Sequence, residues 1–181
     1  LLDLGFTVYG SDLQTNSAIR QLRERGALTF EGHAPEQMQF ARPTLIVYSS
    51  AIRLDNPEMA LAEQQEIPIV RRAVLLANLI RRRRGVCVAG MHGKTTTTAM
   101  LAQTLDALGA APGYAVGAIV PQLGRPARMG DSANRFFVVE TDESDGTLRE
   151  FHAEQSIVLN INEEHLDYYA NFDAVCDEFI A

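Results

Sequence analysis

Short apolar runs alternate along this chain with segments in which apolar residues recur at helical spacing. The runs of the first half predict four strands, at residues 6–10, 27–30, 44–48 and 67–70. Helical patterns follow three of these runs, starting at Asn16 or Ser17, at Pro57 and at Ala73. This alternation of strands and helices is typical of an α/β domain with a parallel sheet.

The second half continues the alternation. Its apolar runs predict buried strands at residues 85–89, 136–139 and 156–159, with a short strand followed by a mobile loop over 112–128. A helix is expected to end at Gly109 with Leu101, Leu105 and Leu108 facing the core, and a last helix begins near Asn171. A second parallel α/β domain is therefore predicted.

A glycine-rich turn joins the strand at 85–89 to the following helix. It reads Gly90-Met91-His92-Gly93-Lys94-Thr95, and Lys94 is the chain's single lysine among sixteen basic residues. Glycines in this context let backbone N–H groups approach a polyphosphate, while the lysine reaches its outer phosphates and the threonine hydroxyl ligates Mg²⁺. The usual loop pattern has a further glycine where this chain has Val88, so a plain turn with a solvated lysine is the alternative.

Polar residues follow several predicted strands of the first half. They are Ser11, Asp12, His33, Ser49 and Ser50. Ligands of parallel sheets sit at the carboxyl ends of the strands, so these residues are candidates for ligand binding. Each one could instead cap a helix or close a turn.

Two acidic clusters follow strands of the second half. Glu140 comes first after its strand and is the best carboxylate for a magnesium ion that neutralises phosphate charge. His165 is a less usual magnesium ligand and could equally cap a loop. For Asp142, Glu143 and Asp145 we expect a solvated acidic loop.

Charge and cysteine content narrow the class of protein. The net charge of −7 argues against generic binding to nucleic acid. Cys87 and Cys176 have no metal-type partners nearby in the sequence, which favours a reduced, cytoplasmic setting, and no membrane span or secretory signal is visible. The arginine run 81–84 suits a solvated helix end or an anion-attracting surface, and we place the domain boundary here, between residues 1–82 and 83–181.

Several segments together resemble the Mur ligases of bacterial cell-wall synthesis. In the second half these are residues 89–100, 140–145 and 160–169, and in the first half 10–13, 49–52, 55–58 and 71–73. The resemblance implies a Rossmann-like domain that binds a UDP-sugar and then a P-loop-type ATPase domain, here truncated. The family's first strand and glycine loop would precede Leu1, and its C-terminal ligase domain would follow Ala181.

The resemblance also implies a reaction. The member indicated is the one that uses ATP to join L-alanine to the lactyl carboxylate of UDP-N-acetylmuramate, through an acyl phosphate, in peptidoglycan precursor synthesis. The implied nucleotide-binding residues are Gly90, Met91, His92, Gly93, Lys94, Thr95 and Thr96. In family terms Lys94 steadies the γ-phosphate, Thr95 and Glu140 hold one Mg²⁺, and His165 holds a second. The implied substrate-binding residues are Ser11, Asp12, His33, Ser49, Ser50 and Ser144, with His92 and Ser144 placed near the reacting carboxylate.

Three other functions fit part of the same pattern. A relative within the family that recycles murein peptides onto UDP-N-acetylmuramate would share both halves, although Ser144-Asp145 and His165-Leu166-Asp167 favour the alanine-adding activity. A generic phosphate-loop kinase or NTPase would share the loop but lack the UDP-sugar domain. A nucleotide-binding module without enzymatic activity is the third alternative.

Overall fold

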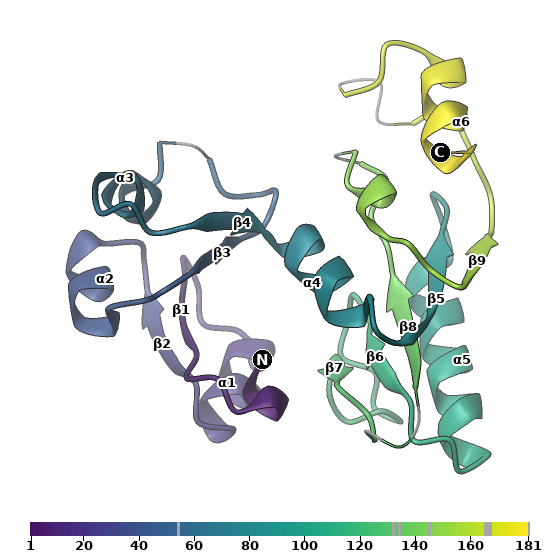
Figure 1. The fold of residues 1–181 in the computed structure, drawn as a ribbon, viewed down its shortest axis with the longest axis horizontal. Coiled ribbons are helices and arrows are strands. Elements are labelled where there is room, and N and C mark those ends of the chain that lie inside the picture. Colours follow the sequence, from purple (N-terminus) through teal and green to yellow (C-terminus); the bar gives the residue numbers. More distant parts are fainter. Residues whose placement is uncertain (54, 132, 134, 145, 165–167, 181) are drawn as a thin grey trace. The chain divides into compact units, whose positions relative to one another are not determined.

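The protein, described here by a computed structural model, folds into two compact units, Leu1–Arg72 and Ala73–Ala181. The structure describes residues 1–53, 55–131, 133, 135–144, 146–164 and 168–180. Helices and parallel strands alternate in each unit (Figure 1), which confirms the predicted α/β class. None of the helices that the structure describes is both long enough and apolar enough to cross a membrane.

The first unit contains two separate pairs of parallel strands. The pairs are β1 (Tyr9–Asp12) with β2 (Leu28–Glu31), and β3 (Ile46–Tyr48) with β4 (Ile69–Arg71). Its helices are the 3₁₀ turn Leu2–Leu4, α1 (Ser17–Glu24), α2 (Pro35–Ala41) and α3 (Pro57–Gln64). The carboxyl ends of β1 and β2 are in register, so the loops that follow them start side by side.

Capping side chains explain where two of these helices begin. The Asn16 side chain accepts the N–H of Ile19 at the start of α1, and Asn56 accepts the N–H of Glu58 at the start of α3, as the sequence predicted. Helix α2 was not predicted. Its signals were Pro35 in the first turn and Glu36 beside it, but only Met38 of its residues is buried, so it lacks an apolar stripe.

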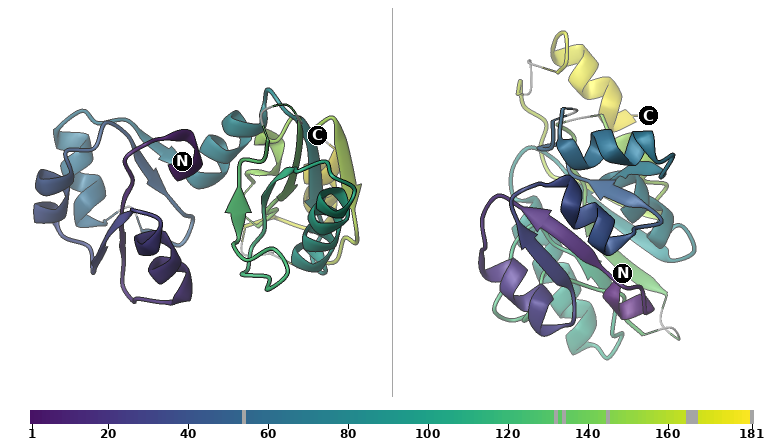
Figure 2. Two further views of the ribbon diagram at one scale, coloured as in Figure 1. Left: turned by 90° about the horizontal axis from the view of Figure 1, so that it is seen from below. Right: turned by 90° about the vertical axis from the view of Figure 1, so that its left-hand side faces the viewer.

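The second unit is built on a five-stranded sheet with the order β7-β6-β8-β5-β9 (Figure 1). Figure 2 shows the ribbon from two further sides. The strands are β5 (Arg84–Ala89), β6 (Gly113–Ala115), β7 (Ala127–Arg128), β8 (Phe136–Glu140) and β9 (Gln155–Val158). The helices are α4 (Arg72–Ile80), α5 (Lys94–Ala107), the 3₁₀ turn Leu148–Glu150 and α6 (Phe172–Ile180). All pairings are parallel except β6 with β7, and β7 lies in the segment predicted to be a loop.

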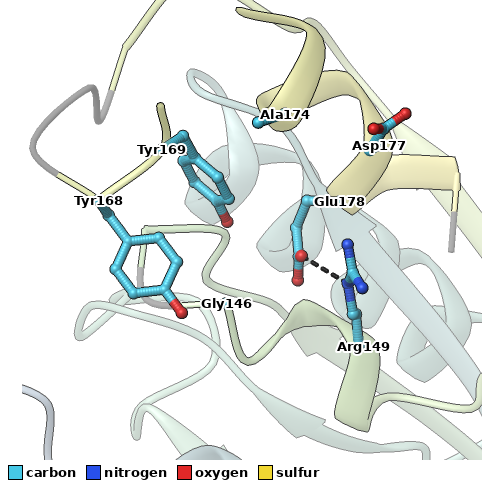
Figure 3. Close-up of a pocket in the computed structure, with 7 residues that line it drawn as sticks. All are labelled: Gly146, Arg149, Tyr168, Tyr169, Ala174, Asp177 and Glu178. Carbon is cyan, nitrogen blue, oxygen red and sulfur yellow. Dashed lines mark hydrogen bonds and ion pairs between the residues drawn. The ribbon is translucent and has the colours of Figure 1, made fainter. Parts of the chain in front are cut away.

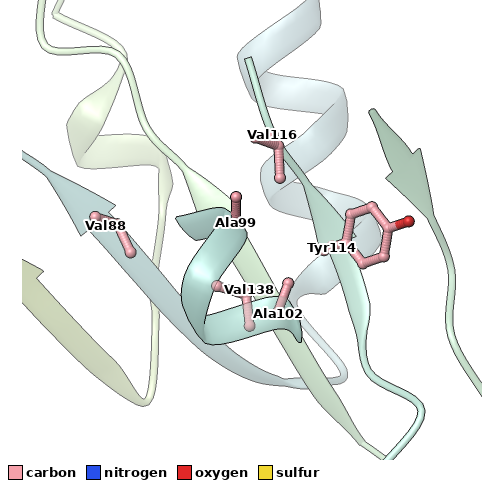
Figure 4. Packing of buried hydrophobic residues seen from close by; sticks show 6 residues of the cluster. All are labelled: Val88, Ala99, Ala102, Tyr114, Val116 and Val138. Carbon is pink, nitrogen blue, oxygen red and sulfur yellow. The ribbon is translucent and has the colours of Figure 1, made fainter. Parts of the chain in front are cut away.

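Alternating side chains of the central strands fill two cores, one on each face of the sheet. Val88 and Val138 pack with Ala99 and Ala102 of α5 on one face (Figure 4). On the other face Cys87, Phe137 and Val139 pack with Ile80 of α4. Because both faces of β5 and β8 are covered, the strand ends that carry the polar loops are held rigidly.

Two burial predictions for this unit were wrong. Strand β9 is exposed along its whole length, with Val158 46% exposed, because among the described residues it lies at the edge of the sheet beside β5 alone. In α5 the buried residues of the core cluster are Ala99 and Ala102. Leu101 and Leu105 are partly buried, but Leu108, beyond the helix end, is 77% exposed.

Candidate functional site

The polar loops after β8, β5 and β9 converge at one edge of the sheet. These three strands are parallel neighbours, with Val88 opposite Glu140 and Ala89 opposite Val158. Backbone bonds continue beyond the strands, since Thr141 N donates to Val88 O and Leu159 N donates to Ala89 O. The glycine-rich loop, the acidic loop and the Asn160 loop therefore begin side by side, as the sequence predicted.

The loop that follows β5 depends on its glycines and on Asn160. Gly90 has φ +130°, and a Cβ there would lie 2.9 Å from Asn160 O, so a side chain is excluded both by conformation and by space. Gly93 has φ +86° and caps α5. The Asn160 side chain accepts the N–H of His92 at 2.9 Å and donates to His92 O at 2.9 Å. These two bonds fix the middle of the loop.

The side chain of Lys94, the first residue of α5, turns back over the loop. Its Nζ donates to Gly90 O at 2.6 Å and to Met91 O at 3.4 Å, and it forms an ion pair with Glu143 Oε1 at 2.8 Å. The Glu143 side chain is only 1% exposed. The prediction of a solvated acidic loop was therefore wrong for Glu143, whose carboxylate is charge-paired inside the site.

Thr95 and Glu140 meet directly beside the lysine. The Thr95 hydroxyl donates to Glu140 Oε1 at 2.8 Å, and the N–H of Gly117, after β6, donates to Oε2 at 2.7 Å. A Cβ on Gly117 would lie 2.8 Å from that carboxylate oxygen, so the strand end leaves room for Glu140 only because the residue is glycine. Gly117 was missed by sequence reasoning because it lies in the segment predicted as a mobile loop.

An apolar cluster supports the loop from the side of α6. Met91 packs with Tyr169 and Val175, and the Tyr169 hydroxyl donates to Glu143 O. Burial raises the pKa of Tyr169 to about 12. Tyr169 also lines a cavity of about 390 Å³ beside an ion pair between Arg149 and the buried Glu178, at 2.7 Å (Figure 3).

The remaining candidates that the structure describes in this unit lie on the loop or on segments next to it. The His92 side chain is 67% exposed and its Nε2 lies 3.0 Å from Glu164 Oε1. Thr96 is exposed on the first turn of α5, and Ser144 is half-buried with its N–H bonded to Asp142 Oδ1. His165 and Asp145 lie outside the residues that the structure describes.

In the first unit, two candidate residues meet at a carboxylate. Ser11, at the end of β1, lies 2.9 Å from His33 Nδ1 and donates its hydroxyl to Glu58 Oε2 at 2.5 Å. Glu58 Oε2 also lies 3.3 Å from His33 Nδ1, and the Gln37 amide, correctly oriented, donates to Glu58 Oε1 at 2.9 Å. Glu58 was missed as a site residue because the sequence placed it at a helix start and in the family-like segment 55–58, and neither gave its side chain a role.

The other three candidates of this unit are not joined to this network by the bonds described. The Asp12 carboxylate accepts the N–H of Gln14 and closes a turn after β1. Ser49 O accepts the N–H of Ile52, and Ser50 is exposed in that turn after β3. These are the turn-closing roles that the sequence left open as alternatives to ligand binding.

The oxygen-rich arrangement at Thr95 and Glu140 fits a magnesium ion. A hydroxyl and a carboxylate converge there, and magnesium prefers oxygen ligands, commonly from one or two protein groups completed by phosphates and water. The residues described contain no group of three or more His, Cys, Asp or Glu side chains able to enclose a metal by themselves.

Comparisons with known proteins agree with this geometry. Residues 1–84 match the family described as "Mur ligase family, catalytic domain", and residues 88–181 match "Mur ligase middle domain". The chain is 48% identical, over 99% of its length, to a UDP-N-acetylmuramate–L-alanine ligase of Methylobacterium sp. (strain 4-46). The match covers 37% of that protein, so the chain spans little more than a third of the relatives' length.

Solved structures give the same result. A UDP-N-acetylmuramate–alanine ligase from Thermotoga maritima is 30% identical with a TM-score of 0.87, covering 96% of this chain and 40% of that one. The UDP-N-acetylmuramate:L-alanyl-γ-D-glutamyl-meso-diaminopimelate ligase from Neisseria meningitides is 25% identical with a TM-score of 0.89, covering 98% and 60%. The match to the Mur ligase middle domain alone covers more than half of the chain's residues, so this chain belongs to the Mur ligase family.

Proposed function

We propose that this chain is part of an ATP-dependent ligase that joins L-alanine to the lactyl carboxylate of UDP-N-acetylmuramate. The observation that carries the proposal is the convergence of Lys94, Thr95 and Glu140 at the ends of neighbouring strands. The names of the relatives near 48% identity support L-alanine as the acceptor. The enzyme would act in the cytoplasm, in peptidoglycan precursor synthesis.

The second unit would bind ATP and catalyse phosphoryl transfer. Backbone N–H groups of the loop at residues 90–96 and the start of α5 would hold the phosphates, and Lys94 would stabilise charge on the γ-phosphoryl group as the carboxylate attacks it. Thr95 and Glu140 would hold Mg²⁺, with His165 proposed for a second ion. The metal would supply neutralisation of phosphate charge.

The protein's contribution to the second half of the reaction is positioning. Transfer of the γ-phosphoryl group would give an acyl phosphate and ADP, and the amine of L-alanine would then attack the acyl carbon and displace phosphate. Activation by ATP makes a protein nucleophile unnecessary, so orientation of the reactants is what remains for the chain to supply. His92 and Ser144, both on loops beside Lys94, would lie near the reacting carboxylate.

The first unit would bind the UDP-sugar. Ser11 and His33 lie at the carboxyl ends of parallel strands, where such sheets bind ligands. Asp12 is next to Ser11 at the end of β1, and Ser49 and Ser50 follow β3. We assign residues 1–82 to this domain and 83–181 to the ATP domain, which the family matches at 1–84 and 88–181 support. Helix α4, however, packs against the sheet of the second unit.

Phosphate release by a full-length protein that carries this sequence tests the proposal. The protein is given Mg-ATP and UDP-N-acetylmuramate with L-alanine, with the tripeptide L-alanyl-γ-D-glutamyl-meso-diaminopimelate, or with no acceptor. We expect release with L-alanine alone. Release only with the tripeptide would identify a recycling ligase, and release with no acceptor would identify a simple NTPase.

A further inference from the structure

Glu143 is a buried carboxylate that the proposed reaction does not use. It lies three residues beyond Glu140 on the loop after β8, and its side chain is 1% exposed. A buried carboxylate is costly unless it is paired, and here the partner is the Lys94 ammonium at 2.8 Å. The acidic loop thus places two carboxylates at the site, Glu140 on the Thr95 hydroxyl and Glu143 on the lysine.

The contacts of Lys94 show what Glu143 adds. An ammonium group has three N–H donors, and those of Lys94 face Gly90 O, Met91 O and Glu143 Oε1. The two carbonyls belong to the same loop as the lysine, within four residues of it. Glu143 is the charged partner and is 49 residues away in the sequence, so it ties the lysine to a different strand end.

Glu143 is itself held from several directions. The Tyr169 hydroxyl donates to its backbone carbonyl, and Tyr169 packs on Met91 of the phosphate loop and on Val175 of α6. The backbone of Glu143 is therefore tied to a packed cluster, and its buried carboxylate extends from that fixed point to Lys94. A lysine side chain has about 2 kcal/mol of rotamer entropy, so a fixed partner removes much of that freedom before a ligand arrives.

We propose that Glu143 is a positioning residue that holds the Lys94 ammonium at the base of the phosphate loop, ready for the transferred phosphoryl group. This inference rests on the proposed function of Lys94. Glu143 also places a negative charge near the bound phosphates. That charge weakens the binding of the nucleotide in the ground state, while the ion pair with Glu143 holds the lysine in the geometry that the transition state needs. Its removal should therefore affect turnover and nucleotide affinity in opposite directions.

The test compares Glu143→Gln with Glu178→Gln in the full-length enzyme. Glu178 is a matched control, since its side chain is 4% exposed and paired with Arg149 at 2.7 Å in the same unit (Figure 3). We expect Glu143→Gln to lower kcat by about tenfold or more and also to lower the Kd for ADP. Calorimetric binding stoichiometry corrects kcat for the fraction of folded protein. Glu178→Gln should lower thermal stability but leave both kcat and the Kd for ADP unchanged.

A third variant separates the effect of the charge of Glu143 from the effect of its side-chain length. Glu143→Asp keeps the charge but is one methylene shorter, so we expect the Kd for ADP of the unmodified protein together with a reduced kcat. The inference is overturned if Glu143→Gln keeps kcat within about twofold, or if Glu178→Gln loses as much. If the unmodified protein did not release phosphate with L-alanine, the proposed function would be overturned instead. The Kd values for ADP would still test whether Glu143 opposes nucleotide binding.

Discussion

Each unit of this chain has a carboxylate at its polar centre, but the two carboxylates have different surroundings. Glu58 in the first unit is 15% exposed and binds neutral or titratable partners, Ser11, His33 and Gln37. Glu143 in the second unit is 1% exposed and binds the ammonium of Lys94. The first centre is a hydrogen-bonded network near the surface, whereas the second is a buried ion pair.

The backbone beneath each centre differs in the same way. In the second unit, β5 and β8 are buried on both faces, and Gly90 of the loop approaches the backbone of Asn160 closely. In the first unit the strands form two separate pairs, and Gly10 and Gly32, next to the site residues, have open space where a Cβ would go. We conclude that backbone geometry sets the second site and that side-chain contacts set the first.

The largest effect is expected at Lys94. Lys94→Ala removes the chain's single lysine and with it the charge at the phosphate loop, so kcat should fall by about 10³-fold or more, ~4 kcal/mol of transition-state stabilisation. The folded state should persist in circular dichroism, with a lower melting temperature because buried Glu143 loses the charge of Lys94. Arg84→Ala is the control, because it removes an exposed cation that pairs with Glu154 in the same unit. Substantial activity in Lys94→Ala would remove the lysine from its proposed role.

The next effect tests whether backbone geometry sets the second site. Gly90→Ala places a Cβ 2.9 Å from Asn160 O at φ +130°, and we expect a loss of about 3 kcal/mol in unfolding free energy together with loss of ATP binding. Gly109→Ala, at φ +78° with open space around the Cβ, should cost about 1 kcal/mol and leave ATP binding intact. Chemical denaturation and calorimetry measure both. Equal losses in the two variants would contradict a special role for the Gly90 contact.

The parts of this site that the sequence predicted are those with local signals. The strand before Gly90, the glycines of the loop and the helix from Lys94 are contiguous, and Glu140 was identified because it directly follows an apolar run. The carboxylates of Glu143 and Glu58 were not identified, because their partners Lys94 and Ser11 are 49 and 47 residues away. An acidic loop that is solvated and one that is folded over a lysine have the same local composition.

Fold errors had a similar origin. The predicted buried strand at residues 156–159 contains the apolar run Ile157-Val158-Leu159. Whether such a run is buried depends on the strands beside it, and β9 has only β5 as a neighbour among the described residues, which is a property of sheet order. The strand β7 has two residues and no apolar run, so its pairing with β6 could not be predicted locally. Helix α2 has starting signals at Pro35 and Glu36 but a single buried residue, which leaves no periodicity to detect.

A smaller and more selective effect is expected in the first unit. Glu58→Gln keeps the size of the side chain but weakens its bonds to Ser11 and His33, so the KM for UDP-N-acetylmuramate should rise by about tenfold, ~1.4 kcal/mol, with the KM for ATP unchanged. Glu63→Gln, an exposed change on the same helix α3, should alter neither. Steady-state kinetics with each substrate varied distinguishes the two. A parallel rise in both KM values would show that the network supports folding and not this ligand.

The smallest effect concerns the thiol beneath the second site. Cys87 is 3% exposed, and burial raises its pKa from 9.0 to about 12, whereas Cys176 is only partly buried. Between about pH 9 and pH 12 the unfolded thiol loses its proton and the folded one keeps it, so the contribution of Cys87 to stability falls as pH rises through that window.

Alkylation at pH 8, read by peptide mass spectrometry, should therefore modify Cys176 readily and Cys87 only when the second unit opens. The first unit contains no cysteine, so Cys87 reports on the second unit alone. Gly90→Ala should accelerate modification of Cys87 because it weakens the structure above β5, and Glu58→Gln should leave the rate unchanged. If both variants accelerated the modification of Cys87 equally, the two units would share their stability. The proposed difference, with backbone geometry setting the second site and side-chain contacts setting the first, would then be wrong.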